Sequence, residues 1–95
     1  MNFTNGRYIT CGVRDSVDPG LMAAIWKYID DMPEPKDYLQ VFKCSNVLGN
    51  QRVIHEQEEP EYKEEYILAS DKPFVGKLFV IDDGDHSTMM LAEEY

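Results

Sequence analysis

The sequence predicts an α+β domain in which one helix packs on an antiparallel sheet of about five strands, opening in the order β-α-β-β. Only one segment combines the spacing of an amphipathic helix with start and stop residues. Several other segments are rich in β-branched and aromatic residues and are separated by turn residues. The length of 95 residues suits one domain, which we expect to span residues 1–95.

The first two elements are expected to be a strand over residues 6–13 and a helix from Pro19 to about Met32. Asp18 is a favourable N-cap, proline fits the first helical position, and the prolines that follow Met32 end the helix. The apolar side chains form one stripe because a helix turns by about 100° per residue. The side chains expected to be largely buried are Ile25, Trp26, Ile29, Leu39, Val41 and Leu78.

The remaining strands are expected near residues 38–45, 51–57, 77–82 and 85–91, with a short one at 65–69. A turn at Gly49-Asn50 would join the first two of these strands. Asp83-Gly84 predicts a hairpin turn of type I′, which needs positive φ at both residues. The resulting strand register pairs Leu78 with Met89, Val80 with Ser87, and Ile81 with His86.

The net charge of −9 is unevenly distributed along the chain. Residues 1–55 contain six acidic and six basic side chains, whereas residues 56–95 contain twelve acidic and three basic ones. This excess argues against direct binding of nucleic acid or an anionic membrane by the second part. It favours a basic protein surface, such as that of a nucleic-acid-binding protein, as the partner. The alternative is that the acids only keep the domain soluble.

The candidate binding site is an eleven-residue run, residues 56–66, with six acids and two tyrosines. If the run is extended, Glu56 and Glu58 lie about 6.6 Å apart, near twice the 3.4 Å repeat of phosphates along a DNA strand. Such a row could imitate the charge of nucleic acid. The alternative is a solvated edge whose charges block aggregation. The expected partner-binding residues are Glu56, Glu58, Glu59, Glu61, Tyr62, Glu64 and Glu65.

A second cluster, residues 82–87, contains the weak metal-ligand candidates Asp82, Asp85 and His86. In a tight hairpin Asp82 and Asp85 share a face while His86 points to the other, so the three would not converge on one ion. We therefore expect a structural turn with no metal and no cofactor. His55 is expected to be a hydrogen-bonded histidine on a strand.

Catalytic and export signals are weak. The sequence has no GxGxxG, P-loop, HExxH or GxSxG motif, and Cys11 and Cys44 lack the spacing of a disulfide or zinc framework. We expect both cysteines to be reduced and buried on strands. The chain begins with no cationic leader followed by an apolar run, and it has no apolar stretch near 18 residues. These observations predict a cytoplasmic protein that is not an enzyme and does not enter a membrane.

Several stretches together resemble a small family of unknown function numbered 960, DUF960, from Gram-positive bacteria and their phages. The resemblance implies a single-domain architecture and brings no activity, cofactor or catalytic residue. It covers nearly the whole chain and depends on Gly6-Arg7-Tyr8-Ile9-Thr10, Asp37-Tyr38-Leu39-Gln40-Val41-Phe42, Ile54-His55-Glu56-Gln57, Pro60-Glu61-Tyr62, the segment Val80 to Met89, and Glu93-Glu94-Tyr95.

The function that the sequence favours is a non-enzymatic acidic interaction protein that docks on a basic surface of nucleic-acid machinery. The setting implied by the resemblance favours an inhibitor encoded by a phage or another mobile element. A ligand-sensing regulatory module of gyrase-inhibitor-like topology is the alternative. A metal-dependent hydrolase built on Asp82, Asp85 and His86 is the third and most remote interpretation.

Overall fold

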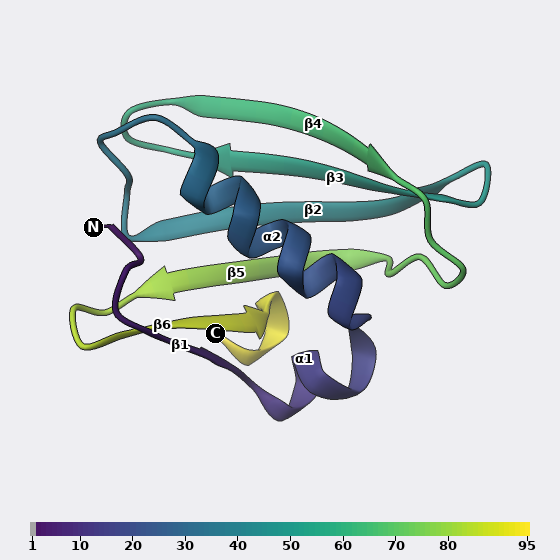
Figure 1. The fold of residues 1–95 in the computed structure, drawn as a ribbon, viewed down its shortest axis with the longest axis horizontal. Coiled ribbons are helices and arrows are strands. Elements are labelled where there is room, and N and C mark those ends of the chain that lie inside the picture. Colours follow the sequence, from purple (N-terminus) through teal and green to yellow (C-terminus); the bar gives the residue numbers. More distant parts are fainter. Residues whose placement is uncertain (1) are drawn as a thin grey trace.

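A computed structural model, which describes residues 2–95, shows a six-stranded sheet with the long helix on one face (Figure 1). The strands lie in the order β1-β6-β5-β2-β3-β4. This confirms the α+β class with one long helix on a sheet, but the sheet has six strands and β1 runs parallel to β6. The elements are β1 (Gly6–Ile9), α1 (Cys11–Ser16), α2 (Pro19–Asp31), β2 (Leu39–Val47), β3 (Asn50–Gln57), β4 (Tyr62–Leu68), β5 (Gly76–Asp82), β6 (His86–Leu91) and η1 (Ala92–Glu94).

The first strand is shorter than expected, because it ends at Ile9 and the short helix α1 follows. The Thr10 side chain accepts a hydrogen bond from the Val13 amide (3.2 Å) and caps this helix, which turns Val13 into the core. The expected strand over residues 6–13 is therefore wrong in its second half. Cys11 lies exposed on α1, whereas Cys44 is buried on β2 as expected.

Helix α2 begins at Pro19 as expected and ends at Asp31, one residue before the expected end. Ile25 and Ile29 are fully buried against the sheet, which confirms the expected apolar stripe. Trp26 is only partly buried, because it lies at the border of the stripe and the Arg7 guanidinium covers its ring at 4.7 Å.

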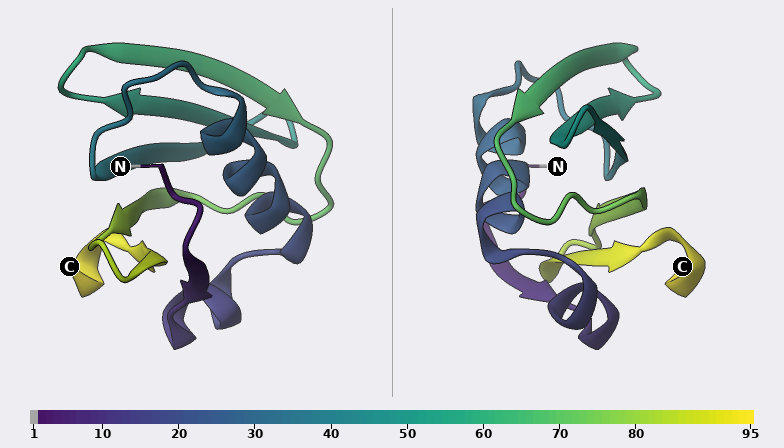
Figure 2. Two further views of the ribbon diagram at one scale, coloured as in Figure 1. Left: turned by 60° about the vertical axis from the view of Figure 1, so that its left-hand side comes forward. Right: turned by 90° about the vertical axis from the view of Figure 1, so that its right-hand side faces the viewer.

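The sheet has one face under α2 and an opposite face where, in the described residues, only the short C-terminal element η1 lies, as Figure 2 shows. From β2, Phe42 and Cys44 face the helix, while Leu39 and Val41 are half-buried on the other side, which we call the open face. The expected burial of Leu39 and Val41 in the core is wrong. The strand has apolar side chains on both faces, so alternation alone does not indicate which face packs on the helix.

The β2–β3 turn consists of Leu48 and Gly49, one residue earlier than expected. Their φ values are 54° and 85°, and positive φ at both central residues is the pattern of a type I′ turn. Leu48 is 97% exposed and therefore gains no packing in exchange for this backbone conformation.

The β5–β6 hairpin has a register two residues away from the expected one, with Leu78 opposite Leu91, Val80 opposite Met89, and Ile81 opposite Thr88. The Asp83 amide donates to the His86 carbonyl (3.1 Å), so the turn is centred on Gly84 and Asp85. Asp83 does not have positive φ, whereas Gly84 does (100°). The expected type I′ turn is wrong here because the Asp83 carboxylate accepts the Asp85 and His86 amides and stabilises a different turn.

We predict that Leu48→Asn stabilises the domain by about 0.5–1 kcal/mol, because asparagine tolerates the left-handed region and Asn-Gly is the preferred type I′ pair. Urea denaturation should show a higher midpoint with an unchanged slope. Leu48→Val is the control and should lower the midpoint, since a β-branched residue fits positive φ poorly. A lower midpoint for the asparagine variant would contradict the turn geometry.

Candidate functional site: an acidic cleft at the β3–β4 turn

A cleft of about 390 Å³ lies at one end of the sheet, between the segment that leads into β2 and the turn that joins β3 to β4. One wall consists of carboxylates, and the only basic side chain in the lining is Lys63. Apolar and aromatic side chains form the rest of the surface, together with the Gln57 amide. The acids are Asp37, Glu56, Glu58, Glu59 and Glu61, and the apolar and aromatic residues are Tyr38, Leu39, Val41 and Tyr62.

The expected partner-binding residues are partly gathered here. Glu56, Glu58, Glu59, Glu61 and Tyr62 line the cleft. Glu64 and Glu65 point from opposite faces of β4, because they are consecutive on a strand. Of these two, Glu65 pairs with Arg52 across the sheet.

The cleft acids differ in how far their charge is balanced. Glu56 pairs with Lys43 (2.9 Å) and Lys63 (3.9 Å), and the hydrogen bond from Lys43 lowers its pKa. Within residues 2–95, Glu58, Glu59 and Glu61 form no ion pair, and all three are exposed on the turn. These three carboxylates are therefore available to a cationic partner.

The acids surround a cleft and do not form one extended row. Strand β3 ends at Gln57, and residues 58–61 form a turn, so Glu58 does not continue the strand that carries Glu56. The spacing calculated for an extended chain is therefore wrong at this pair.

A buried amide network connects the two walls of the cleft. The Gln57 side-chain oxygen accepts hydrogen bonds from the Asp37 amide (2.7 Å) and from the Gln40 side chain (2.8 Å). The Gln57 nitrogen donates to the Pro60 carbonyl (2.8 Å) in the turn. Because Gln40 and Gln57 are nearly inaccessible, loss of these bonds would leave buried polar atoms unpaired. The network thus fixes the acidic turn relative to Asp37 and Tyr38.

His55 extends this network, as the expected hydrogen-bonded strand histidine. Its Nε2 lies 2.7 Å from the Gln40 side-chain oxygen, which is an acceptor, so Nε2 carries the proton. The ring stacks on Phe42 (4.3 Å between centroids) and meets Tyr62 edge-on (5.2 Å). Its Nδ1 is buried without a hydrogen-bond partner among residues 2–95, and burial lowers the pKa of His55 to about 4. The histidine is therefore neutral at physiological pH.

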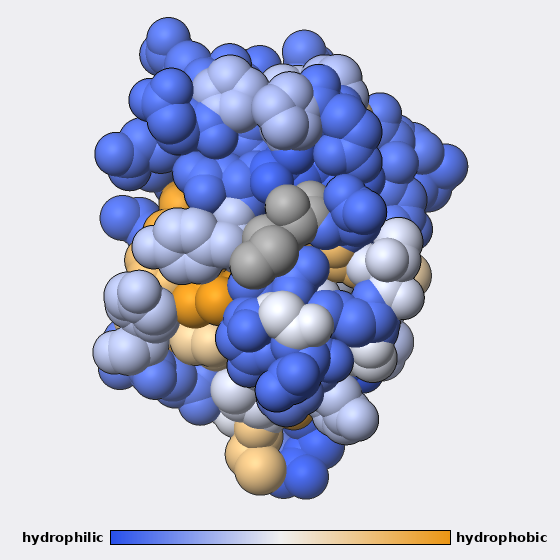
Figure 3. Space-filling view, turned by 90° about the vertical axis from the view of Figure 1, so that its left-hand side faces the viewer, coloured by the Kyte–Doolittle hydropathy of each residue, from blue (hydrophilic) through white to orange (hydrophobic). Residues whose placement is uncertain are grey.

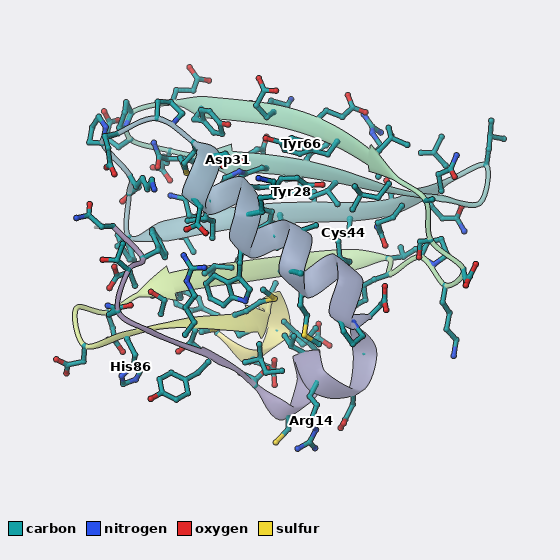
Figure 4. All side chains as sticks on the ribbon, viewed as in Figure 1. Arg14, Tyr28, Asp31, Cys44, Tyr66 and His86 are labelled. Carbon is teal, nitrogen blue, oxygen red and sulfur yellow. The ribbon has the colours of Figure 1, made fainter. Side chains whose placement is uncertain are left out.

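Tyr66 attaches strand β4 to helix α2. Tyr66 stacks on Tyr28 of α2 with 3.7 Å between ring centroids (Figure 4). Burial raises the pKa of Tyr62 to about 12, so its hydroxyl remains a hydrogen-bond donor at neutral pH. The stacked pair fixes β4 against α2, and β4 begins directly after the acidic turn.

The residues of this cleft that the sequence did not reveal are Asp37, Tyr38 and Gln57. Gln57 shares its strand face with buried residues such as Val53 and His55, and glutamine at alternate strand positions was a signal that could have found the network. Asp37 and Tyr38 come from a segment about 20 residues earlier in the chain, and only the fold brings them to the turn.

The weak metal-ligand candidates lie elsewhere, at the β5–β6 turn. The Asp82 carboxylate is 4% exposed and accepts hydrogen bonds from the Phe3 amide (3.1 Å), the Asn5 side chain (2.9 Å) and the Gly84 amide (2.9 Å). Burial alone would raise the pKa of Asp82, but these bonds outweigh it and lower the pKa. His86 is near Asp83 (3.5 Å), and in the described part of the chain no three such side chains are placed to hold a metal. Asp82 instead ties the N-terminal segment to the hairpin.

The fold and its cleft define a small α+β domain with its long helix on one sheet face and with acids gathered at one end of the sheet. Residues 6–94 match a family described as "Staphylococcal protein of unknown function (DUF960)", and the chain belongs to this family, which confirms the expected resemblance.

A crystal structure described as "protein of unknown function from Enterococcus faecalis" has a similar fold, with a TM-score of 0.85 and 28% sequence identity. The alignment covers 100% of this chain and 96% of that chain. No curated protein matches the sequence. In residues 2–95, none of the helices is long and apolar enough to cross a membrane.

We predict that the domain loses stability between about pH 6.5 and pH 4 because of His55. The folded protein holds this histidine neutral down to about pH 4, whereas the unfolded chain protonates it near pH 6.5. The stabilisation is therefore complete above pH 6.5 and is lost as the pH falls, by at most about 1.4 kcal/mol per pH unit. Urea unfolding across this range should be steeper in pH for the wild type than for His55→Gln. Equal slopes would contradict the buried neutral histidine.

We predict that Asp82→Asn lowers the free energy of unfolding by about 2 kcal/mol, since an amide cannot accept all three hydrogen bonds that the carboxylate accepts. Asp85→Asn is the control, because Asp85 is exposed and should contribute less than about 0.5 kcal/mol. Chemical denaturation measures both variants. An equal effect would show that only the negative charge of the turn matters.

Proposed function

We propose that this protein is a non-enzymatic interaction protein that binds a basic segment of a partner protein in the acidic cleft. The observation that carries the proposal is the composition of the cleft. Five carboxylates surround a cavity that contains one lysine, and three of those carboxylates have no ion-pair partner in the described residues. A site with this excess of negative charge favours a cationic ligand.

Lysine and arginine side chains suit both parts of the cleft. Their charged ends can form charge-assisted hydrogen bonds with Glu58, Glu59 and Glu61. Their apolar stems can pack on Tyr38, Leu39 and Val41, since long basic side chains place their methylene groups on apolar surface. The cleft therefore recognises a basic side chain by its shape as well as by its charge.

The finer form of the proposal is that the partner is a nucleic-acid-binding protein, inhibited by a protein of mobile-element origin. A cleft ringed by acids favours insertion of individual basic side chains over imitation of a regular phosphate row. A partner of this class should bind the wild-type protein and should elute when added salt screens the charges. Duplex DNA should also elute it if DNA and this protein bind the same surface of the partner.

A small cationic ligand is the second candidate, which would make the domain a ligand-sensing module. The cavity volume of about 390 Å³ falls in the range of small-molecule sites, which supports this candidate. Calorimetric titration with spermidine distinguishes the two, because a sensor should bind this amine tightly at physiological salt and an electrostatic protein-binding cleft should not.

We predict that the triple variant Glu58→Gln, Glu59→Gln, Glu61→Gln weakens binding of a labelled oligoarginine peptide by at least about tenfold. The matched control is Asp71→Asn, Asp85→Asn, Glu93→Gln, which removes the same charge from exposed positions outside the cleft. Fluorescence anisotropy should show a loss of less than about threefold for the control, because distant charges are largely screened. Equal losses would show that net charge, and not the cleft, attracts the peptide.

A further inference from the structure

The open face of the sheet has an apolar centre that α2 does not cover. Leu39 lies opposite Ile81, Val41 opposite Phe79, and Phe79 opposite Met90, so the patch crosses the neighbouring strands β2, β5 and β6. All five side chains are half-buried, whereas single-sided sheets normally present a polar face to water. We call these five residues the apolar platform.

The platform is continuous with the acidic cleft. Leu39 and Val41 belong to both, and hydrophilic surface over β3 and β4 adjoins an apolar area on the side away from α2 (Figure 3). Tyr38 is 47% exposed where the two meet. A segment seated on the platform would therefore have one end in the cleft.

The end of the chain adds an aromatic rim. Element η1 turns the chain back toward β5, and Glu94 holds it by accepting hydrogen bonds from the Thr10 hydroxyl (2.7 Å) and the Leu91 amide (2.8 Å). Tyr95 then meets the Phe79 ring edge-on at 5.5 Å and remains 71% exposed. Exposed tyrosines beside an apolar patch are typical of protein-binding surfaces.

We propose that the apolar platform binds the apolar side of a basic amphipathic helix of the partner, while basic side chains at one end of that helix enter the cleft. This inference rests on the proposed function and names the form of the basic segment. A helix is the element that commonly packs on the free face of a sheet. Charge complementarity is confined to the cleft end, because Lys43 and Lys77 lie next to the platform on the same face. At that end it favours a basic segment over a second copy of this chain, which carries a net charge of −9.

The test compares two peptides of about 18 residues with the same lysine and leucine content, which corresponds to about five helical turns. One has leucine at helical spacing, and the other has the same residues in an order without an apolar stripe. The wild type should bind the amphipathic peptide at least about tenfold more tightly than the scrambled one. Equal affinities would overturn the inference without any need for a variant.

Substitutions then locate the binding surface. Phe79→Thr, Ile81→Thr, Met90→Thr should abolish the preference for the amphipathic peptide and change oligoarginine binding by less than about threefold, because none of these three residues lines the cleft. The matched control is Ile9→Thr, Ile67→Thr, Val75→Thr, at exposed apolar positions outside the platform, and it should retain the preference. Equal loss in both triples would overturn the assignment to the platform.

The outcomes separate the two proposals. If oligoarginine binds but the amphipathic peptide has no advantage, the helix inference fails and the cleft proposal stands. If neither peptide binds, the proposed function fails as well. If sedimentation shows a dimer in the wild type that the platform triple dissociates, a second copy occupies the platform and the inference is wrong.

Discussion

A helix about 10–12 Å wide cannot cover a sheet of six strands, which at a spacing of about 4.8 Å measures about 24 Å between its edge strands. In this protein α2 covers the central strands, and the N-terminal segment adds Phe3, Val13 and Val17 to the same side. Asp82 fastens that segment by accepting the Phe3 amide, and Arg7 pairs with Asp30 of α2. In the part of the chain that the structure describes, the other face is covered only by η1 and Tyr95 near Phe79, so its apolar side chains remain partly accessible.

The position of the acidic turn depends on a second constraint, the pairing of buried amides. Gln57 can satisfy its polar atoms only if the turn and the segment before β2 approach it from both sides. Gln40 and His55 complete the network from the neighbouring positions. The interior therefore dictates where the exposed carboxylates lie, although those carboxylates form few contacts themselves. A binding site held in this way loses little conformational entropy on association.

The sequence predicted the elements whose boundaries have strong local signals. Asp18-Pro19 and the prolines after Met32 indicated α2 almost to the residue. The alternation of side chains over residues 6–13 predicted one long strand, but the strand ends at Ile9 and a capped helix follows. So short a strand cannot be distinguished from the start of a helix by alternation alone. It also failed to assign the faces of β2, since this strand is apolar on both sides. The end of the first strand and the buried face of β2 both depend on which elements pack against these strands.

The candidate site was predictable only in the part that has a local signal in the sequence. The run around Pro60 shows its charge in the sequence, and most of its acids do line the cleft. Glu64 and Glu65 cannot both lie on one acidic face, because consecutive strand residues point to opposite sides, and the register places only Glu65 on the sheet face of Glu56. Asp37 and Tyr38 join the cleft only through long-range packing, which a single sequence does not encode in any local pattern.

The measurement that tests the central claim most directly is paramagnetic relaxation enhancement with a spin label at one end of a basic amphipathic peptide. If the cleft and the open face form the binding surface, amide signals should broaden most at residues 58–61 and at Tyr38 and Val41. The signals of α2 should broaden less, because the sheet keeps this helix farther from the label. A peptide label at its other end should shift the broadening toward Phe79 and Met90. Broadening concentrated on α2, or spread evenly over the acidic surface, would contradict the account.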